Sequence, residues 1–119
     1  MTKRICVLED NDDIIEIIGF ILEEEHYEVK YFKNIQDFKK GANAFRANLF
    51  LLDVMLPDGN GLDLCCELKA NKETSNMPIV MMSANFSDAE MRSRCNAEDY
   101  INKPFDIDDF VSRVDAQIH

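Results

Sequence analysis

The chain has 119 residues, of which 46% are hydrophobic and 30% are charged. This balance is typical of a globular protein, and we expect one domain over residues 1–119. The formal net charge of −10 disfavours direct binding to nucleic acid or to anionic membranes. Because no apolar run is long enough to cross a bilayer and no secretory signal is recognisable, the sequence predicts a cytoplasmic location.

The chain carries four cysteines: Cys6, Cys65, Cys66 and Cys95. None belongs to a CxxC motif, and the only histidines are His26 and His119, so a zinc site is not expected. Cys6 lies in an apolar run and Cys65 on an apolar helical face, which predicts buried, reduced thiols. We interpret the adjacent pair Cys65-Cys66 as structural, with a redox role as the less favoured alternative.

The first predicted strand is the apolar run Arg4–Leu8, which ends at the acidic pair Glu9-Asp10. Either Asn11 or Asp12 can cap the helix that follows. In that helix, isoleucines and leucines recur at helical spacing until a run of glutamates closes it toward solvent.

Residues Glu28–Phe32 alternate polar and apolar side chains, which predicts a strand near the edge of a sheet. Asn34 is placed to cap a second helix with one apolar face. We expect this helix to end close to Gly41 or Asn43.

The central segment, Leu49–Asp53, is a continuous apolar run that ends in a carboxylate, as is typical of a strand buried on both faces. A Pro/Gly turn follows it. Leu62, Cys65 and Leu68 then mark a third helix, which we expect to reach about Asn71.

A fourth buried strand is predicted over Met77–Met82, with Ser83 at its carboxyl end. Residues Ser87–Arg94 have weaker helical character. A short strand over Asp99–Asn102 and a last helix with apolar residues from Ile107 to Ile118 complete the chain.

Five strands alternating with five helices predict an α/β fold with a parallel sheet covered by helices on both faces. We expect a flavodoxin-like, doubly wound sheet of five strands in the order 2-1-3-4-5.

Polar residues follow four of these strands: Glu9 and Asp10, Asp53, Ser83, and Lys103. Parallel strands bring such residues to one edge of the sheet, where sites of this fold form. Three carboxylates held close together favour a cation, and Mg²⁺ suits oxygen ligands that leave room for a phosphate. A lysine and a hydroxyl opposite would hold a phosphoryl group, with an aspartate as the nucleophile. The alternative is that each residue only ends a strand or caps a helix.

Four segments, each at the end of a predicted strand, resemble the motifs of response-regulator receiver domains of two-component signalling. They are VLEDN (7–11), LLDVMLPDGNGL (51–62), MMSA (81–84) and DYINKPF (99–105). No segment is specific alone, but the four in this order are, and the likeness runs from about Lys3 to Ile118.

The resemblance implies that Asp53 is the phospho-acceptor and that Mg²⁺ is the cofactor. Asp10 and Asp53 would bind the ion directly, and Glu9 would act through a water molecule. Met55 would contribute its backbone carbonyl, so that its position matters more than its side chain.

By the same resemblance, Ser83 would hydrogen-bond the phosphoryl group and Lys103 would pair with it. The Lys103–Pro104 peptide bond is expected to be cis, as some X-Pro bonds are. Tyr100 corresponds to the family's switch aromatic, which turns inward when Ser83 is drawn to the phosphate and so reshapes the surface of the fourth and fifth helices. A core tyrosine without a switching role is the alternative.

The sequence departs from the family between Ser83 and Lys103, where the chain is slightly shorter than usual. Asn96 stands where glycine is common, and asparagine tolerates the left-handed conformation that such a turn uses. With Met91 as its one large apolar residue, the fourth helix is expected to be short and poorly anchored. A dimer formed through this helix is therefore in doubt.

The resemblance implies a signalling phospho-acceptor, not a metabolic enzyme, that receives a phosphoryl group from a sensor histidine kinase or a histidine phosphotransfer protein. A downstream effector or a C-terminal output domain outside this chain could be a further partner. A phosphatase with an aspartyl nucleophile is disfavoured, because Met55 occupies the position where such enzymes place a second acid. A degenerate receiver that only binds partners is disfavoured because the predicted site residues are all present.

Overall fold

The computed structural model describes residues 2–118, so Met1 and His119 lie outside the described residues. His119 is one of the two histidines considered above for a zinc site. The central sheet has five parallel strands: β1 (Arg4–Leu8), β2 (Glu28–Phe32), β3 (Leu49–Asp53), β6 (Ile79–Ser83) and β7 (Asp99–Asn102). Their order is β2-β1-β3-β6-β7, which confirms the predicted doubly wound arrangement.

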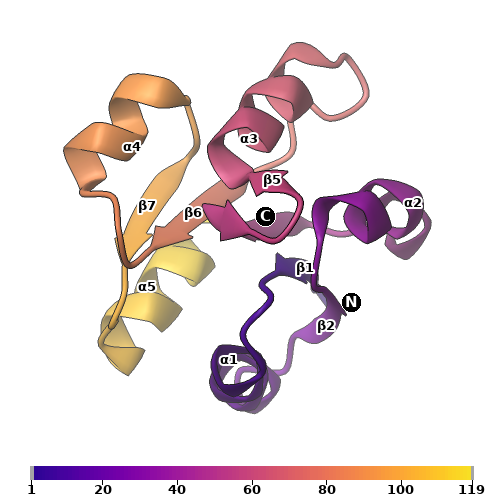
Figure 1. Cartoon of the computed structure of the whole chain (residues 1–119). Helices are drawn as coiled ribbons and strands as arrows, with labels where there is room; N and C mark the ends of the chain where they lie inside the picture. The colour runs from indigo at the N-terminus through magenta and orange to yellow at the C-terminus, as the bar shows by residue number, and fades with distance from the viewer. Residues whose placement is uncertain (1, 119) are drawn as a thin grey trace.

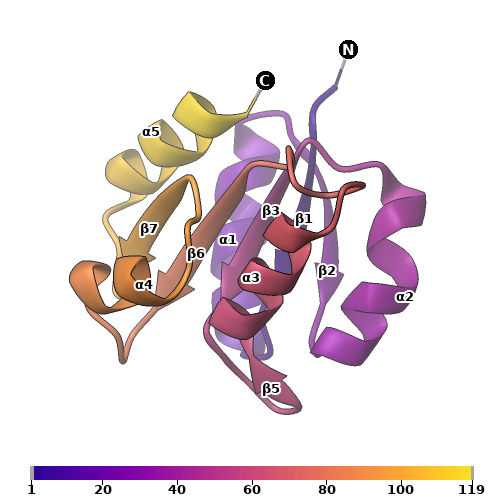
Figure 2. The ribbon, with the colours of Figure 1, turned by 90° about the horizontal axis from the view of Figure 1, so that it is seen from above.

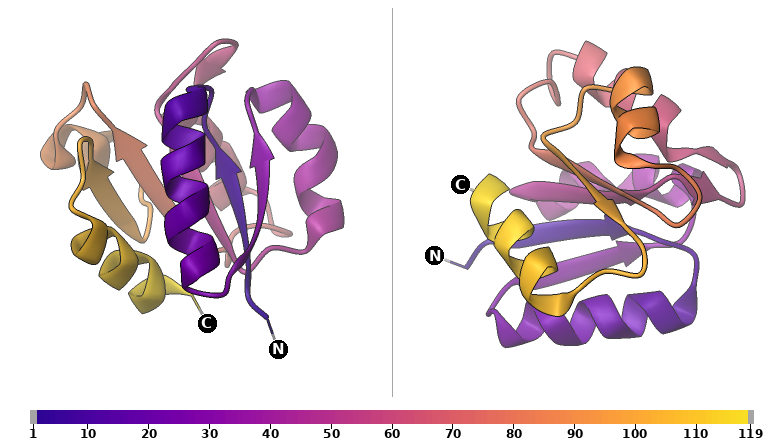
Figure 3. Two further views of the ribbon diagram at one scale, coloured as in Figure 1. Left: turned by 90° about the horizontal axis from the view of Figure 1, so that it is seen from below. Right: turned by 90° about the vertical axis from the view of Figure 1, so that its left-hand side faces the viewer.

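Helices cover both faces of this sheet (Figure 1). They are α1 (Asp12–Glu24), α2 (Ile35–Phe45), α3 (Gly61–Ala70), α4 (Asp88–Arg94) and α5 (Ile107–Gln117). Helices α1 and α5 lie on one face (Figure 3), and α2, α3 and α4 lie on the other (Figure 2). Within the described residues, no helix is both long enough and apolar enough to span a membrane.

The core divides into two apolar clusters, one on each side of the sheet. Strands β3 and β6 are buried along their whole length, as their unbroken apolar sequences predict. Strand β2 alternates exposed and half-buried residues until Phe32, which fits its place at the edge. The sheet is therefore a rigid platform whose central strands end at the polar residues singled out above.

Several element boundaries differ from those predicted. Asn11, not Asp12, caps α1, and its side chain accepts hydrogen bonds from two backbone N–H groups. Helix α2 does not end near Gly41 or Asn43, both of which lie inside it, but continues to Phe45. It ends there because Arg46, the next residue, takes the left-handed backbone conformation. Strand β6 begins at Ile79, two residues later than expected.

The Pro/Gly turn after β3 contains a small hairpin that the sequence did not reveal. Strands β4 (Met55–Leu56) and β5 (Gly59–Asn60) pair antiparallel and project at the carboxyl edge of the sheet (Figure 2). At its tip, Asp58 accepts hydrogen bonds from the backbone N–H groups of Ile35 (2.8 Å) and Gln36 (3.0 Å). These bonds hold the pKa of Asp58 below its usual value and tie the hairpin to the start of α2.

The prediction of a reduced thiol is wrong for Cys65, which forms a disulfide with Cys95 and so joins α3 to the end of α4. Their Cα atoms lie 6.4 Å apart, within the range that a disulfide can bridge. Cys6 is a buried thiol, as expected, and burial raises its pKa to about 12. The sequence did not indicate the pair because 30 residues separate its members and only the packing of α3 against α4 brings them together.

The expectation that α4 is poorly anchored is also wrong. Helix α4 is short, but its residue Met91 is fully buried in the core, and the disulfide at Cys95 fixes the C-terminal end of the helix. Ser87 and Glu90 form a reciprocal capping box at its start. Asn96, just beyond the helix, is not among the residues with a left-handed backbone, so this turn does not use the conformation predicted for it.

Candidate functional site

The structure brings the predicted acidic residues together at the carboxyl edge of the sheet. Glu9 and Asp10 follow β1, and Asp53 is the last residue of the neighbouring strand β3. One carboxylate oxygen from each of the three lies within 4.8 Å of the others. This cluster occupies the switch point between the first and third strands of the fold, where the helices after β1 and β3 leave to opposite faces.

Glu9 is the most deeply buried member of the cluster, with 1% of its surface exposed. One of its oxygens pairs with the ammonium of Lys103, and the other accepts a hydrogen bond from the Asn11 N–H (3.2 Å). Asp10, in contrast, is exposed. A buried carboxylate of this kind persists only with a charged partner, and Lys103 supplies it.

The carboxylate of Asp53 is buried and lies 3.3 Å from the Lys103 ammonium. Burial, and next the negative charge of Glu9, raise the pKa of Asp53 to about 6, while Lys103 opposes the shift. At neutral pH this carboxylate is therefore largely ionised, as a nucleophile must be, but it is ionised at some cost in stability.

A glycine that the sequence did not single out allows the chain to leave Asp53. A Cβ atom on Gly61 would lie 1.9 Å from the Asp53 carbonyl oxygen, so no side chain fits there. The Gly61 N–H donates to the Val54 carbonyl (2.7 Å), and the side chain of Asn60 caps α3. The Asn-Gly pair at the end of the hairpin could have signalled this close approach.

The donor set of this cluster fits a hydrated magnesium ion. Three carboxylates face one ammonium, which leaves two negative charges without a partner in the cluster. Glu9, Asp10 and Asp53 offer oxygen atoms only, and their spacing leaves room for water molecules to complete the coordination, as Mg²⁺ prefers.

Met55, the predicted backbone ligand, begins β4 two residues after Asp53. Its side chain is exposed and makes no part of the core. This agrees with the expectation that its position, not its side chain, is what matters; its role as a ligand stays a prediction.

Ser83 ends β6, the strand next to β3, and is buried. Its hydroxyl oxygen accepts hydrogen bonds from the N–H groups of Asn85 and Phe86, both at 3.0 Å. These two bonds leave the hydroxyl proton free to be donated. Ser83 therefore orders the loop before α4 and keeps a donor for a ligand at the edge of the sheet.

Lys103 follows β7, and its N–H donates to the Ser83 carbonyl (2.8 Å). The Lys103–Pro104 peptide bond is cis, as the resemblance implied. The ammonium group reaches back across the edge of the sheet to both Glu9 and Asp53.

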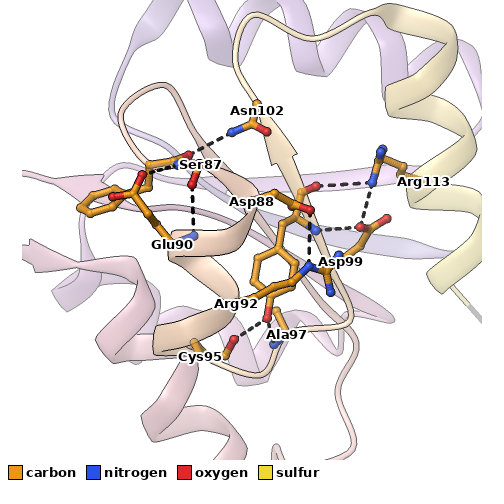
Figure 4. Close-up of polar contacts among 11 residues, drawn as sticks. Ser87, Asp88, Glu90, Arg92, Cys95, Ala97, Asp99, Asn102 and Arg113 are labelled. Carbon is orange, nitrogen blue, oxygen red and sulfur yellow. Dashed lines mark hydrogen bonds and ion pairs between the residues drawn. The ribbon is translucent and has the colours of Figure 1, made fainter.

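Tyr100, the predicted switch residue, points into the protein from β7 and is almost fully buried. Its hydroxyl donates to the Cys95 carbonyl and accepts from the Ala97 N–H (2.9 Å), so the polar end of the ring is bonded and not in water. The guanidinium of Arg92 lies 4.6 Å from the ring centre. Figure 4 shows these surroundings, with Cys95 and Ala97 below the short helix that carries Arg92.

Two further contacts in this region were not foreseen. Asn102 donates from its side chain to the Phe86 carbonyl (2.9 Å). Arg113 of α5 pairs with Asp99 (2.9 Å), as Figure 4 shows. They link the loop before α4 to β7, and β7 to α5. The sequence carried no signal for either contact, since the first joins a side chain to a backbone carbonyl 16 residues away and the second joins two side chains 14 residues apart.

The chain matches the family model described as the response regulator receiver domain over residues 5–115. It therefore belongs to the response-regulator receiver family, which confirms the predicted resemblance. Among the relatives is the phosphate regulon transcriptional regulatory protein PhoB of Escherichia coli K12, which is 34% identical over 119 residues. That match covers 98% of this chain and 52% of PhoB, so the chain spans about half the length of this relative.

Solved structures share the fold closely. A response regulator from Chloroflexus aurantiacus superposes with a TM-score of 0.90 at 24% identity, covering 98% of this chain and 97% of the other. The receiver domain of a sensor histidine kinase from Pseudomonas aeruginosa PAO1, solved with a magnesium ion in its active site cleft, gives a TM-score of 0.86 at 24% identity and covers 98% of each chain.

Proposed function

We propose that residues 1–119 act as one Mg²⁺-dependent receiver domain that accepts a phosphoryl group on Asp53. The observation that carries this proposal is the position of the Asp53 carboxylate, buried beside Lys103 and within one cluster with Glu9 and Asp10. Asp10 and Asp53 would hold the metal directly, Glu9 would do so through water, and the Met55 carbonyl would complete the protein's ligands. When bound, Mg²⁺ would neutralise charge on the phosphoryl oxygens.

In the transfer, an oxygen of Asp53 attacks phosphorus and the bond from phosphorus to the donor's imidazole nitrogen breaks. Lys103 is released from part of its pairing with the carboxylates and pairs with the phosphoryl group, while the Ser83 hydroxyl donates a hydrogen bond to a phosphoryl oxygen. Attack by water on the acyl phosphate later restores the carboxylate and ends the signal. This chemistry modifies the protein itself and converts no metabolite, as expected of a signalling switch.

We infer that the phosphoryl donor, a sensor histidine kinase or histidine phosphotransfer protein, docks on the surface between α1 and α5. Ile17, Phe20 and Ile107 are large apolar residues exposed there, and they line a groove of about 520 Å³ with the acidic side chains of Asp13 and Glu16. Both helices begin at the edge of the sheet that carries Asp53. A donor with an apolar patch and basic neighbours would thus present its phosphohistidine beside the acceptor.

For the output, we propose that the phosphoryl group draws Ser83 toward it and that Tyr100 carries the change to the surface of α4, β7 and α5. A downstream effector, or an output domain outside this chain, would read that surface in the cytoplasm. PhoB, which is about twice as long as this chain, is a transcriptional regulatory protein, which is consistent with such an output.

The deciding experiment is intact-mass measurement after incubation with acetyl phosphate, with and without Mg²⁺. A gain of one phosphoryl group is expected only with Mg²⁺, and it should be absent from Asp53→Asn, the closest uncharged replacement. Labelling of the Asp53→Asn variant to the same extent, or labelling that does not depend on Mg²⁺, would overturn the assignment of the acceptor or of the metal. No labelling of the parent by either acetyl phosphate or a panel of phosphorylated donors would show a binding module that has kept the residues without the reaction.

A further inference from the structure

The Cys65–Cys95 disulfide fixes a backbone group that holds Tyr100 in place. Cys95 caps the C-terminal end of α4: its N–H donates to the Met91 carbonyl (3.0 Å), and its own carbonyl accepts a hydrogen bond from the Tyr100 hydroxyl. The Ala97 N–H, two residues further on, donates to the same hydroxyl. The covalent link to Cys65 therefore restrains both partners of the buried ring.

The other end of the disulfide belongs to the element that leaves the candidate site. Cys65 lies on α3, which begins at Gly61 in contact with the Asp53 backbone. The seven-residue helix α4 has one buried side chain, Met91, so without the disulfide this side chain alone would hold the helix against the core. The bond thus joins the moving segment expected in a switch to the rigid element packed on the acceptor strand.

A third cysteine lies beside this bond and is open to solvent. Cys66 is an exposed thiol on α3, and its sulfur donates to the carbonyl of Arg94 (3.1 Å), the residue before Cys95. The two bonded cysteines are buried, so external reagents reach Cys66 first. In a reducing compartment, which we propose for this protein, disulfides are usually transient and redox-sensing.

We propose that Cys65, Cys66 and Cys95 form a reversible thiol–disulfide site that fixes or frees the segment from α4 to β7, with a protein dithiol reductant as its reaction partner. Cys66, as thiolate, attacks the Cys95 sulfur, so that a Cys66–Cys95 bond forms, the Cys65–Cys95 bond breaks and Cys65 leaves as a thiolate that takes up a proton. This exchange moves the disulfide to the surface without net oxidation or reduction. The reductant then donates two electrons and two protons, which yields two cysteine thiols and the reductant's own disulfide.

The test compares the oxidised chain before and after treatment with reduced thioredoxin, by native alkylation and by hydrogen exchange. Alkylation is expected at Cys66 alone before treatment, and at Cys65, Cys66 and Cys95 afterwards. Cys6 serves as an internal control because it is a buried core thiol that reacts only if the protein unfolds. The N–H groups of Cys95 and Ala97 should exchange at least about tenfold faster after reduction, while those of β3 keep their rates.

The Cys66→Ser variant tests the exchange step, and it is expected to keep the disulfide but to be reduced at least about tenfold more slowly. Cys95→Ser removes the cysteine that both disulfides share, so it should show the exchange rates of the reduced form without any reductant. If this variant does not fold, reduction of the parent chain gives the same comparison. Equal exchange rates in the oxidised and reduced forms, reduction only together with Cys6 alkylation, or unchanged reduction of Cys66→Ser would each overturn the proposal.

The consequence for phosphorylation rests on the proposed function. Because the disulfide holds Tyr100 inward, as phosphorylation is proposed to do, the two should favour each other. We expect the oxidised chain to bind beryllofluoride with Mg²⁺ at least about fivefold more tightly than the reduced chain. Equal binding by both forms would refute the coupling, whereas binding by neither would refute the proposed function and leave the thiol–disulfide site to the tests above.

Discussion

The ammonium of Lys103 lies 3.3 Å from the Asp53 carboxylate while it also pairs with Glu9. One cation thus serves two buried carboxylates: Glu9, which directly follows β1, and Asp53, which is the last residue of β3. Because the cluster keeps an excess of negative charge even with Lys103 in place, a divalent ion and the lysine act on the same carboxylates. The stability of the metal-free protein and its affinity for Mg²⁺ are therefore linked.

Replacing the lysine should expose this link. In Lys103→Met, which keeps an unbranched side chain one heavy atom shorter, Glu9 loses its counter-ion. We expect the metal-free protein to lose about 3 kcal/mol in its free energy of unfolding at pH 7.5. Mg²⁺ should restore more stability to this variant than it adds to the parent. Urea denaturation with EDTA or with Mg²⁺ measures both effects, and equal gains from Mg²⁺ in the two proteins would contradict the prediction.

The raised pKa of Asp53 predicts how stability depends on pH. The pKa of Asp53 is about 6 in the folded chain, whereas its ordinary value is 3.8. Between these pH values the folded state binds the proton more tightly than the unfolded state, so the free energy of unfolding falls as the pH rises. Asp53→Asn cannot ionise, and in EDTA at pH 7.5 we expect it to be more stable than the parent by roughly 1–3 kcal/mol. The difference should fall toward zero below about pH 4. Urea denaturation across this range is the measurement, and a difference that does not vary with pH would be the contrary result.

Gly61 offers a test of the backbone that positions the acceptor. In Gly61→Ala the new methyl group would meet the carbonyl of Asp53 at 1.9 Å, and because both groups belong to backbone that is held in place, we expect a loss of about 2–3 kcal/mol in the free energy of unfolding. Gly19→Ala is the matched control. There the methyl group meets only the terminal hydroxyl of Tyr31, which can swing away, and the change should stay below about 1 kcal/mol. Thermal or urea unfolding of both variants decides the matter, and similar losses in the two would contradict a special role for Gly61.

The docking surface can be separated from the chemistry with one substitution. Phe20 is 68% exposed on α1, so Phe20→Ala should leave folding and labelling by acetyl phosphate unchanged. Transfer from a phosphorylated protein donor should fall at least about tenfold, as is usual when an aromatic anchor is removed from an interface. Initial rates with both donors give the answer. An equal fall with acetyl phosphate would show that Phe20 affects the site and not the docking.

Much of the fold was predictable because it depends on local patterns. The unbroken apolar sequences of β3 and β6 and the helical spacing in α1 and α5 each report the burial of their own segment. Alternation of strands and helices then leaves few possible topologies, since crossovers between parallel strands are right-handed. Because the strands are parallel, their carboxyl ends lie at one edge of the sheet, which places Asp53 and Lys103 there together. The residues of the candidate site could therefore also be predicted from sequence.

The tertiary structure decided what depends on packing between distant segments. The Cys65–Cys95 bond arises because α3 and α4 pack side by side, and cysteine spacing along a chain does not report that contact. The cap that Asp58 gives to α2 and the burial of Tyr100 among the groups of Cys95 and Ala97 have the same origin. Hydrophobic burial is not directional: it depends on the apolar area of a side chain and not on one particular partner. The pattern of apolar residues in the sequence is therefore enough to predict which side chains are buried. The specific partner of a polar or sulfur atom is directional, and only the folded chain sets it.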